Sequence, residues 1–132
     1  MAHQLFCEAG HSKGNIARNT IVEKTLSLLE QKYMNDLKTA YVAQQVGVSE
    51  RHLQRVLKSK THKTFREHLN QIRLEKARAM LIGTNASIQE ILENVGYQDY
   101  SHFAKVFKAV HDLTPARYRE KYKELYSIFK KG

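Results

Sequence analysis

The sequence predicts an all-α fold in which two similar helix–turn–helix units are joined by one long helix. Apolar residues recur at three- and four-residue spacing, and valine and tyrosine fall inside these helical periods instead of alternating as in strands. Residues 42–58 and 91–108 repeat one pattern of helix, glycine turn and helix. The single proline, Pro115, stands in the first turn of an expected helix, where its missing N–H costs nothing.

The composition fits a small basic domain. A chain of 132 residues can bury its own core without disulfides or metal. Lysine and arginine number 22 against 13 acidic residues, and the formal charge of +9 favours a polyanionic partner, nucleic acid first. One cysteine excludes an internal disulfide and agrees with a reducing compartment. With no signal peptide and no apolar run that could span a bilayer, we expect a cytoplasmic protein without a membrane partner.

The first 18 residues show no sustained period and are expected to form a flexible leader. Three candidate metal ligands in this segment are spaced by four residues: His3, Cys7 and His11. Because Gly10 and Gly14 interrupt the segment, it makes a poor site. Neither a metal nor another cofactor is therefore predicted.

A helix that braces the first unit is expected from Asn19 onward. Its predicted buried stripe consists of Val22, Leu26, Leu29 and Tyr33. Asn35 and Asp36 are expected to end it.

The first helix–turn–helix unit is VAQQVGVSERHLQRVLK, residues 42–58. Gly47 can take the backbone conformation of a sharp turn, and Ser49 can cap the helix that follows. One face of that helix is apolar, formed by Leu53, Val56 and Leu57, while the other carries Arg51, Gln54 and Arg55. Arginine pairs with guanine edges and glutamine with adenine edges, so this face suits major-groove contact. A basic amphipathic helix is also a common solvated surface, so one such unit does not decide between the two interpretations.

The second unit, ILENVGYQDYSHFAKVFK at residues 91–108, repeats the first. Phe103 stands 50 positions after Leu53, whereas Gly96 stands 49 after Gly47, so the second turn is one residue longer. Asp99 takes the place of the Ser49 cap. Two matched units favour DNA binding over the solvated-surface interpretation.

A linker helix is expected between the units, over residues 64–82. Its predicted buried side consists of Phe65, Leu69, Ile72, Ala77 and Leu81. Arg73 and Lys76 either touch phosphates or solubilise the helix, and the interpretation as solvated side chains is favoured. Gly83 is expected to end the helix, and Ser87 with Glu90 forms a capping box at the start of the next one.

The last helix is expected to begin at Thr114-Pro115 and to carry an apolar stripe. The members of that stripe are Tyr118, Tyr122, Leu125 and Phe129. The stripe either folds back onto the second unit or contacts another protein, because so long an exposed aromatic stripe is unusual in a monomer.

These motifs resemble the DNA-binding domain of the AraC/XylS family of bacterial transcription regulators, over roughly residues 19–122. Besides the two units, NQIRLEKARAML and LTPARYR stand in the family's order and spacing. The resemblance implies about seven helices and a DNA-binding domain over residues 19–132. Within it we expect a first subdomain (19–63), the linker helix (64–82) and a second subdomain with the C-terminal helix (83–132).

The resemblance also implies a function: a sequence-specific regulator, commonly an activator, whose two recognition helices enter successive major-groove segments of a DNA duplex. The expected base-reading residues are Arg51, Gln54 and Arg55 in the first helix and Tyr100, Ser101, His102, Ala104 and Lys105 in the second. Phosphate contacts are expected from Ser49, His52, Lys58, Lys60, Asp99 and Lys108. RNA polymerase is a candidate second partner.

Four residues depart from the family's pattern. Leu92 stands where alanine is usual, His68 where tyrosine is usual, and His62 and Asp112 where glycine is common after the recognition helices. Aspartate tolerates a left-handed backbone better than most residues, so Asp112 fits its position more easily than His62.

Enzymes and other binding modules are the alternatives. The sequence shows no glycine-rich phosphate loop, no HExxH pair and no catalytic serine–histidine–acid spacing, so no enzymatic activity is predicted. A basic helical RNA-binding or protein-interaction module remains the rival interpretation. We expect the chain to bind DNA as a monomer, either as a stand-alone regulator or as part of one with a sensor or dimerisation domain elsewhere.

The two units differ in charge. Residues 38–63 carry six basic side chains against one acidic, a net charge of +5, whereas residues 87–111 carry two against three, a net charge of −1. Since phosphate neutralisation supplies much of the affinity for DNA, the first unit is expected to hold the duplex and the second to add discrimination.

Overall fold

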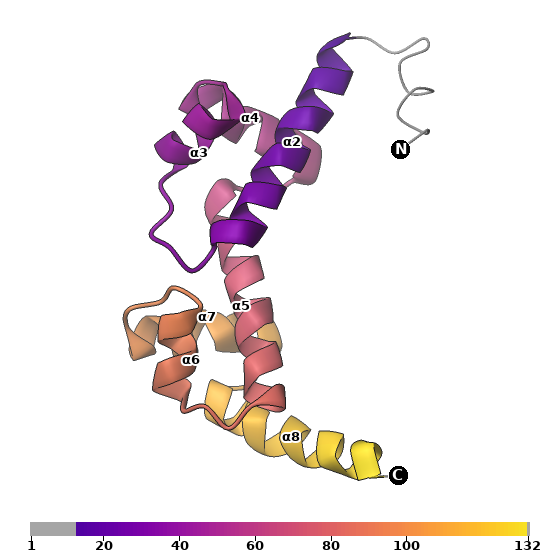
Figure 1. Ribbon diagram of the computed structural model, residues 1–132, viewed down its shortest axis with the longest axis vertical. Coiled ribbons are helices and arrows are strands. Elements are labelled where there is room, and N and C mark those ends of the chain that lie inside the picture. Colours follow the sequence, from indigo (N-terminus) through magenta and orange to yellow (C-terminus); the bar gives the residue numbers. More distant parts are fainter. Residues whose placement is uncertain (1–12, 132) are drawn as a thin grey trace. The chain divides into compact units, whose positions relative to one another are not determined.

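The computed structural model describes residues 13–131, and in this range it contains seven α-helices and no strand (Figure 1). The helices are α2 (Lys13–Lys32), α3 (Thr39–Val46), α4 (Glu50–Thr61), α5 (Phe65–Gly83), α6 (Ile88–Asn94), α7 (Tyr100–His111) and α8 (Pro115–Lys131). The all-α prediction and its helix number are confirmed. No helix in this range is both long and apolar enough to cross a membrane.

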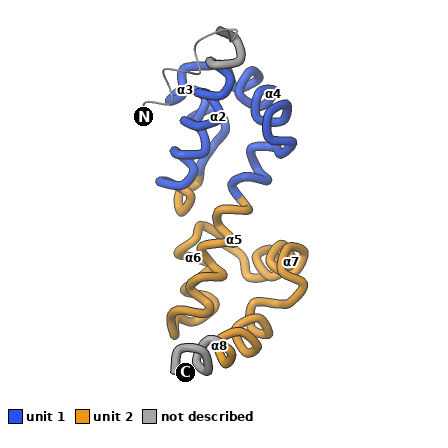
Figure 2. Tube along the Cα trace, turned by 90° about the vertical axis from the view of Figure 1, so that its right-hand side faces the viewer, with its two compact units in different colours: residues 1–32, 37–69 blue, residues 33–36, 70–132 orange. Residues whose placement is uncertain are grey.

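The chain divides into two compact units (Figure 2). Unit 1 comprises residues up to 32 together with 37–69, and unit 2 comprises residues 33–36 together with 70 onward. The division falls inside α5, the helix that the sequence interpretation treated as a linker (64–82) between the two subdomains. Each unit contains one helix–turn–helix motif, α3–α4 in unit 1 and α6–α7 in unit 2.

The core of unit 1 lies among α2, α3, α4 and the first turns of α5. Its buried apolar residues are Ile21, Leu29, Val42, Ala43, Leu53, Val56, Leu57, Phe65 and Leu69.

Two predictions about α2 were wrong. The helix includes Lys13, so residues 13–18 are not part of a flexible leader. The leader over residues 1–12, with its candidate metal ligands, lies outside the described residues.

Part of the buried stripe of α2 was also placed one residue too late, although Leu29 is buried as predicted. Its innermost positions are Ile21, Thr25 and Leu29, whereas Val22 and Leu26 are only half-buried. Thr25 is fully buried. Because threonine is not counted among the apolar residues that define a helical period, the sequence pattern did not show that the buried face of α2 passes through this position.

The core of unit 2 lies among α5, α6, α7 and α8. It consists of Leu74, Ala77, Leu81, Ile91, Leu92, Val95, Tyr97, Phe103, Phe107 and Tyr118. The rings of Phe103 and Phe107 are 5.8 Å apart and fully buried, so they anchor α7. Leu74 was missing from the predicted stripe of α5, and Ile72, which was included, is half-buried. On α8 the stripe folds back only in part: Tyr118 is buried, but Leu125 is 43% exposed.

Basic side chains from distant positions satisfy exposed backbone carbonyls in unit 2. Arg73 donates through Nε to the carbonyl of Tyr33 (2.8 Å) and through Nη2 to that of Asn35 (2.7 Å). Arg119 on α8 donates to the carbonyls of Leu81 (3.0 Å) and Thr84 (3.1 Å) at the end of α5. The last carbonyls of a helix have no partner within it, so cationic donors are well placed there. The interpretation of Arg73 as a solvated side chain was therefore wrong.

Glycine is required at the turn of each helix–turn–helix motif. Gly47 has φ +93° and Gly96 has φ +104°, a left-handed conformation that side chains disfavour. Their surroundings differ. A Cβ at Gly47 would meet no atom within 4 Å, whereas one at Gly96 would lie 2.9 Å from both the Tyr33 carbonyl oxygen and Arg73 Nε.

This difference leads to a paired prediction. Gly47→Ala should lower the free energy of unfolding by about 1–2 kcal/mol, the cost of the left-handed backbone alone. Gly96→Ala should cost more, because the added methyl also displaces the guanidinium of Arg73 from the carbonyl that it binds. Chemical denaturation of both variants measures the two losses. Equal losses would contradict the close approach at Gly96.

Candidate nucleic-acid interface

In unit 1, the packing of α4 determines which of its side chains face outward. The Oγ of Ser49 accepts a hydrogen bond from the His52 amide (3.1 Å), so the predicted cap is confirmed. Leu53, Val56 and Leu57 are buried, as predicted. The exposed side chains of the helix include Arg51, Gln54, Arg55, Lys58 and Lys60, whereas His52 is half-buried.

The three predicted base-reading side chains of α4 lie on one exposed face. Arg51 and Arg55 are one helical turn apart, and Gln54 is adjacent to them along the helix. Within the described part of the chain, none of the three makes a hydrogen bond or an ion pair. Their donors and acceptors are therefore available to a ligand.

The end of α4 is held by a histidine from α5. His62 follows the helix with φ +63° and donates its amide to the Lys58 carbonyl. Thr61 Oγ1 donates to the Leu57 carbonyl (2.7 Å) and lies 2.7 Å from Nε2 of His68. A hydroxyl carries one hydrogen, so Nε2–H of His68 is the donor in the second contact. His68 is buried, and this burial, reinforced by nearby Lys63 and partly opposed by Glu67, lowers its pKa.

In unit 2, α7 is built in the same way. Oδ2 of Asp99 accepts a hydrogen bond from the His102 amide (2.9 Å) and so caps the helix. Phe103 and Phe107 are buried. Four of the five predicted base-reading residues are exposed: Tyr100, Ser101, His102 and Lys105. The fifth, Ala104, is half-buried. The exposed Lys108 lies one turn beyond Ala104.

The last turn of α7 also contains a histidine, here on the helix itself. The ring of His111 lies 4.5 Å from that of Phe107 and 5.5 Å from that of Tyr118 on α8. Its Nε2 is buried and has no hydrogen-bond partner among the described residues. Burial is the main cause of a lowered pKa at His111; Arg78 lowers it further, while Glu75 and Asp112 act in the opposite direction. Asp112 itself has φ +67°, so both substitutes for glycine take the left-handed conformation.

Tyr97 is a positioning residue that the sequence interpretation missed. Its hydroxyl donates to Asn70 Oδ1 (2.8 Å), and its ring lies 5.7 Å from that of His102 and 5.3 Å from that of Phe103. The guanidinium of Arg73 lies over the same ring, 5.6 Å from its centre. Tyr97 therefore connects α5 to the first turn of α7. A tyrosine within a turn carries no periodic signal that could have identified it.

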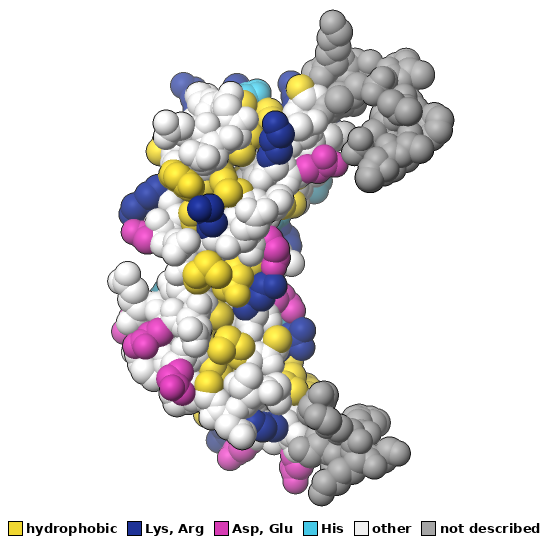
Figure 3. Space-filling view, in the orientation of Figure 1, with side chains coloured by type: hydrophobic (Ala, Val, Ile, Leu, Met, Phe, Trp, Pro, Cys, Tyr) yellow, Lys and Arg dark blue, Asp and Glu magenta, His cyan; other side chains and the backbone are white. Residues whose placement is uncertain are grey.

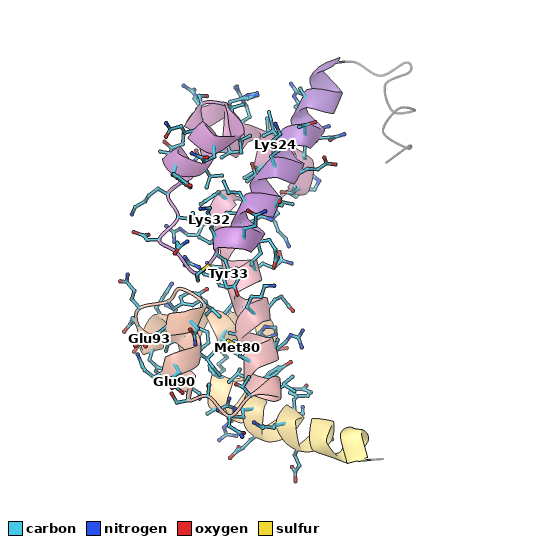
Figure 4. All side chains as sticks on the ribbon, in the orientation of Figure 1. Lys24, Lys32, Tyr33, Met80, Glu90 and Glu93 are labelled. Carbon is cyan, nitrogen blue, oxygen red and sulfur yellow. The ribbon has the colours of Figure 1, made fainter. Side chains whose placement is uncertain are left out.

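The surfaces of the two units differ in charge. Figure 3 shows acidic side chains over α6, and Figure 4 identifies them as Glu90 and Glu93. The Glu90 carboxylate accepts a hydrogen bond from the Ser87 amide (2.8 Å), and this confirms the predicted capping box. In unit 1, basic side chains are visible over the α3–α4 region in the same view.

Comparison with known proteins identifies relatives of this arrangement. A family model described as a helix-turn-helix domain matches residues 42–121. The xylose operon regulatory protein of Escherichia coli (strain K12) is 37% identical over 84 residues, which are 64% of this chain and 21% of that protein. The transcriptional activator RhaS of Escherichia coli (O1:K1 / APEC) is 35% identical over 95 residues, which are 72% of this chain and 34% of that protein. The chain thus spans only a fifth to a third of the length of these relatives.

Solved structures resemble the same region. A transcriptional regulator from Chromobacterium violaceum, described as AraC-type DNA-binding domain-containing, has a TM-score of 0.73 and 29% identity, covering 76% of this chain and 90% of that one. The DNA-binding domain of AdpA, a global transcriptional factor in complex with a target DNA, has a TM-score of 0.72 over 79% of this chain and 93% of that one. Because its identity is 21%, AdpA supports the fold alone.

Two histidines predict acid sensitivity, the buried His68 and the half-buried His111. Their pKa values are lower in the folded protein than the ordinary value of 6.5, so the unfolded chain binds protons more tightly. The stability that this difference contributes is fully present above about pH 6.5 and is lost as the pH falls from 6.5 toward the lowered pKa values. Thermal unfolding between pH 7.5 and 5 should show this loss.

The control is the double variant His68→Gln/His111→Gln. Glutamine retains a donor for Thr61 but does not bind a proton in this range. The variant should lose less stability on acidification than the parent. Parallel pH profiles of the two proteins would contradict the assignment of the histidines as the titrating groups.

Proposed function

Because the chain belongs to the AraC/XylS family of DNA-binding transcription regulators, we propose that α4 and α7 are recognition helices that enter adjacent major-groove segments of one DNA duplex. The observation that carries the proposal is the shared construction of the two helices. Each follows a left-handed glycine turn, is capped by a side-chain oxygen and buries one face. The opposite face of each helix is left to a ligand.

Base reading is assigned to the outward-facing residues of these faces, which are exposed except for the half-buried Ala104. In α4 they are Arg51, Gln54 and Arg55, and in α7 they are Tyr100, Ser101, His102, Ala104 and Lys105. The two arginines suit the paired acceptors of guanine, and the glutamine suits adenine. These pairings distinguish one base pair from another in the major groove.

Phosphate contacts are assigned to His52, Lys58, Lys60 and Lys108, together with Ser49 at the start of α4. The carboxylate of Asp99 repels a phosphate, so its part in the interface is to cap α7. Unit 1 supplies all of these side chains except Lys108, whereas α6 of unit 2 carries the acidic Glu90 and Glu93. Unit 1 is therefore the main electrostatic anchor.

The regulatory output proposed here is activation of transcription by a bacterial cytoplasmic protein, with RNA polymerase as the protein partner. Support comes from the activator RhaS among its relatives. We propose that one chain occupies one DNA site, since it contains both recognition helices.

Selection of bound duplexes from a random pool tests DNA binding and yields the site. Two helices in one chain should recognise an asymmetric site with two parts about 34 Å, or about 10 bp, apart. Footprinting and stoichiometry measure the spacing and the number of chains. A palindromic site that needs two chains, or stronger binding of structured RNA than of duplex DNA in competition, would contradict the proposal.

Arg55→Ala and Lys105→Ala test the inequality of the two units. Arg55→Ala should weaken binding to the selected duplex by about 1–3 kcal/mol and relax the preference at one base pair. Lys105→Ala should have a smaller effect, because the duplex is held chiefly by unit 1. Titrations at several salt concentrations compare the variants, and an equal or larger loss from Lys105→Ala would overturn the assignment of the anchor.

A further inference from the structure

The two proposed recognition helices offer chemically different faces to a groove. Helix α4 exposes Arg51, Gln54 and Arg55, whose side chains form two hydrogen bonds at once to a purine edge. Helix α7, with the sequence YSHFAKVFKAVH, contains no arginine, asparagine, glutamine, aspartate or glutamate. The helices share one register, because Ser49 and Asp99 cap them at matching positions. Gln54 therefore corresponds to Ala104, and Arg51 to Ser101.

An apolar pair occupies the first turns of α7. Tyr100 is 44% exposed, and Ala104 lies one turn later on the same side of the helix. The ring of His102 contacts Tyr97, on a different side of α7. Tyr100 also contrasts with Tyr97, which is buried and donates its hydroxyl to Asn70. The result is a small, partly exposed apolar strip in the first turns of the helix that would enter the groove.

Thymine is the base that such a strip fits. In the major groove it presents a C5-methyl group, and alanine and aromatic side chains make apolar contact with that methyl. We propose, on the basis of the proposed function, that Tyr100 and Ala104 recognise thymine methyl groups in the part of the site bound by α7. Helix α4 reads purine edges by hydrogen bonds, and α7 reads thymines by apolar contact.

The charges of unit 2 agree with this division. Lys105 and Lys108 are the basic residues of α7 other than histidine, and Glu90 and Glu93 lie on the neighbouring α6. The α6–α7 motif therefore contributes little phosphate attraction, and its share of the binding free energy depends on the contacts of α7 with bases. Burying one methyl group is equivalent to about a threefold to fivefold change in affinity, so discrimination in this part of the site is modest.

Replacement of thymine by uracil tests the proposal directly, since uracil lacks only the C5-methyl group. The full chain is titrated with the selected duplex and with duplexes in which each thymine in turn is uracil. Base pairs whose preference relaxes in Arg55→Ala mark the part bound by α4. In the other part, at least one uracil should weaken binding about threefold to fivefold.

Reciprocal variants connect the effect to one side chain. Ala104→Gln gives α7 the residue found at the matching position of α4, and it should abolish the uracil effect and shift that base pair toward adenine. Lys105→Ala is the matched control on the same helix, and it should weaken binding to thymine and uracil duplexes by the same factor. Tyr100→Ser, at an exposed position, provides a second variant if Ala104→Gln does not fold; it too should reduce the uracil effect.

The outcomes separate this inference from the proposed function. A preferred duplex whose α7 part contains no required thymine, or is insensitive to uracil, overturns the thymine assignment and leaves groove binding intact. The same holds if a folded Ala104→Gln or Tyr100→Ser variant retains the full uracil effect. Failure to select any preferred duplex contradicts the proposed function itself.

Discussion

A left-handed backbone residue lies before and after each of the two recognition helices, and the arrangement of both motifs depends on this constraint. Gly47 and His62 flank α4, and Gly96 and Asp112 flank α7; these are the only residues with left-handed φ in the described range. Such a residue lets the chain change direction within a few positions. Each 12-residue recognition helix can therefore pack one of its faces against the supporting helix. The reversal costs free energy at His62 and Asp112, where a side chain is present, and packing at the adjacent turns offsets that cost.

The two units meet this requirement with different chemistry. In unit 1 the turn after α4 contains a short hydrogen-bond network around Thr61 and His68. In unit 2 the equivalent turn is aromatic, with His111 between Phe107 and Tyr118. In both, burial lowers the pKa of a histidine, so folding of each motif is linked to proton release, and unfolding to proton uptake, through one residue.

The proposed function divides affinity and discrimination unevenly between the units. Unit 1 combines a basic surface with bidentate side chains, whereas unit 2 combines an acidic α6 with a recognition helix of small, apolar and singly charged groups. In the proposed function, unit 1 therefore supplies both the phosphate contacts and the stronger base discrimination, whereas α7 adds modest discrimination by apolar contact. This division follows from which side chains α4 and α7 expose.

The sequence alone determined the features that depend on neighbours within about one helical turn. The helices other than the start of α2, the Ser49 and Asp99 caps, the Ser87–Glu90 capping box and the glycine turns were predictable, because a cap or a buried stripe is formed by residues three or four apart. Tertiary structure alone decided the roles of Thr25, Leu74, Arg73 and Tyr97. Arg73 binds carbonyls 38 and 40 positions away, and Tyr97 binds an amide 27 positions away. No local period encodes such contacts, because they exist only when the folded chain brings distant segments together.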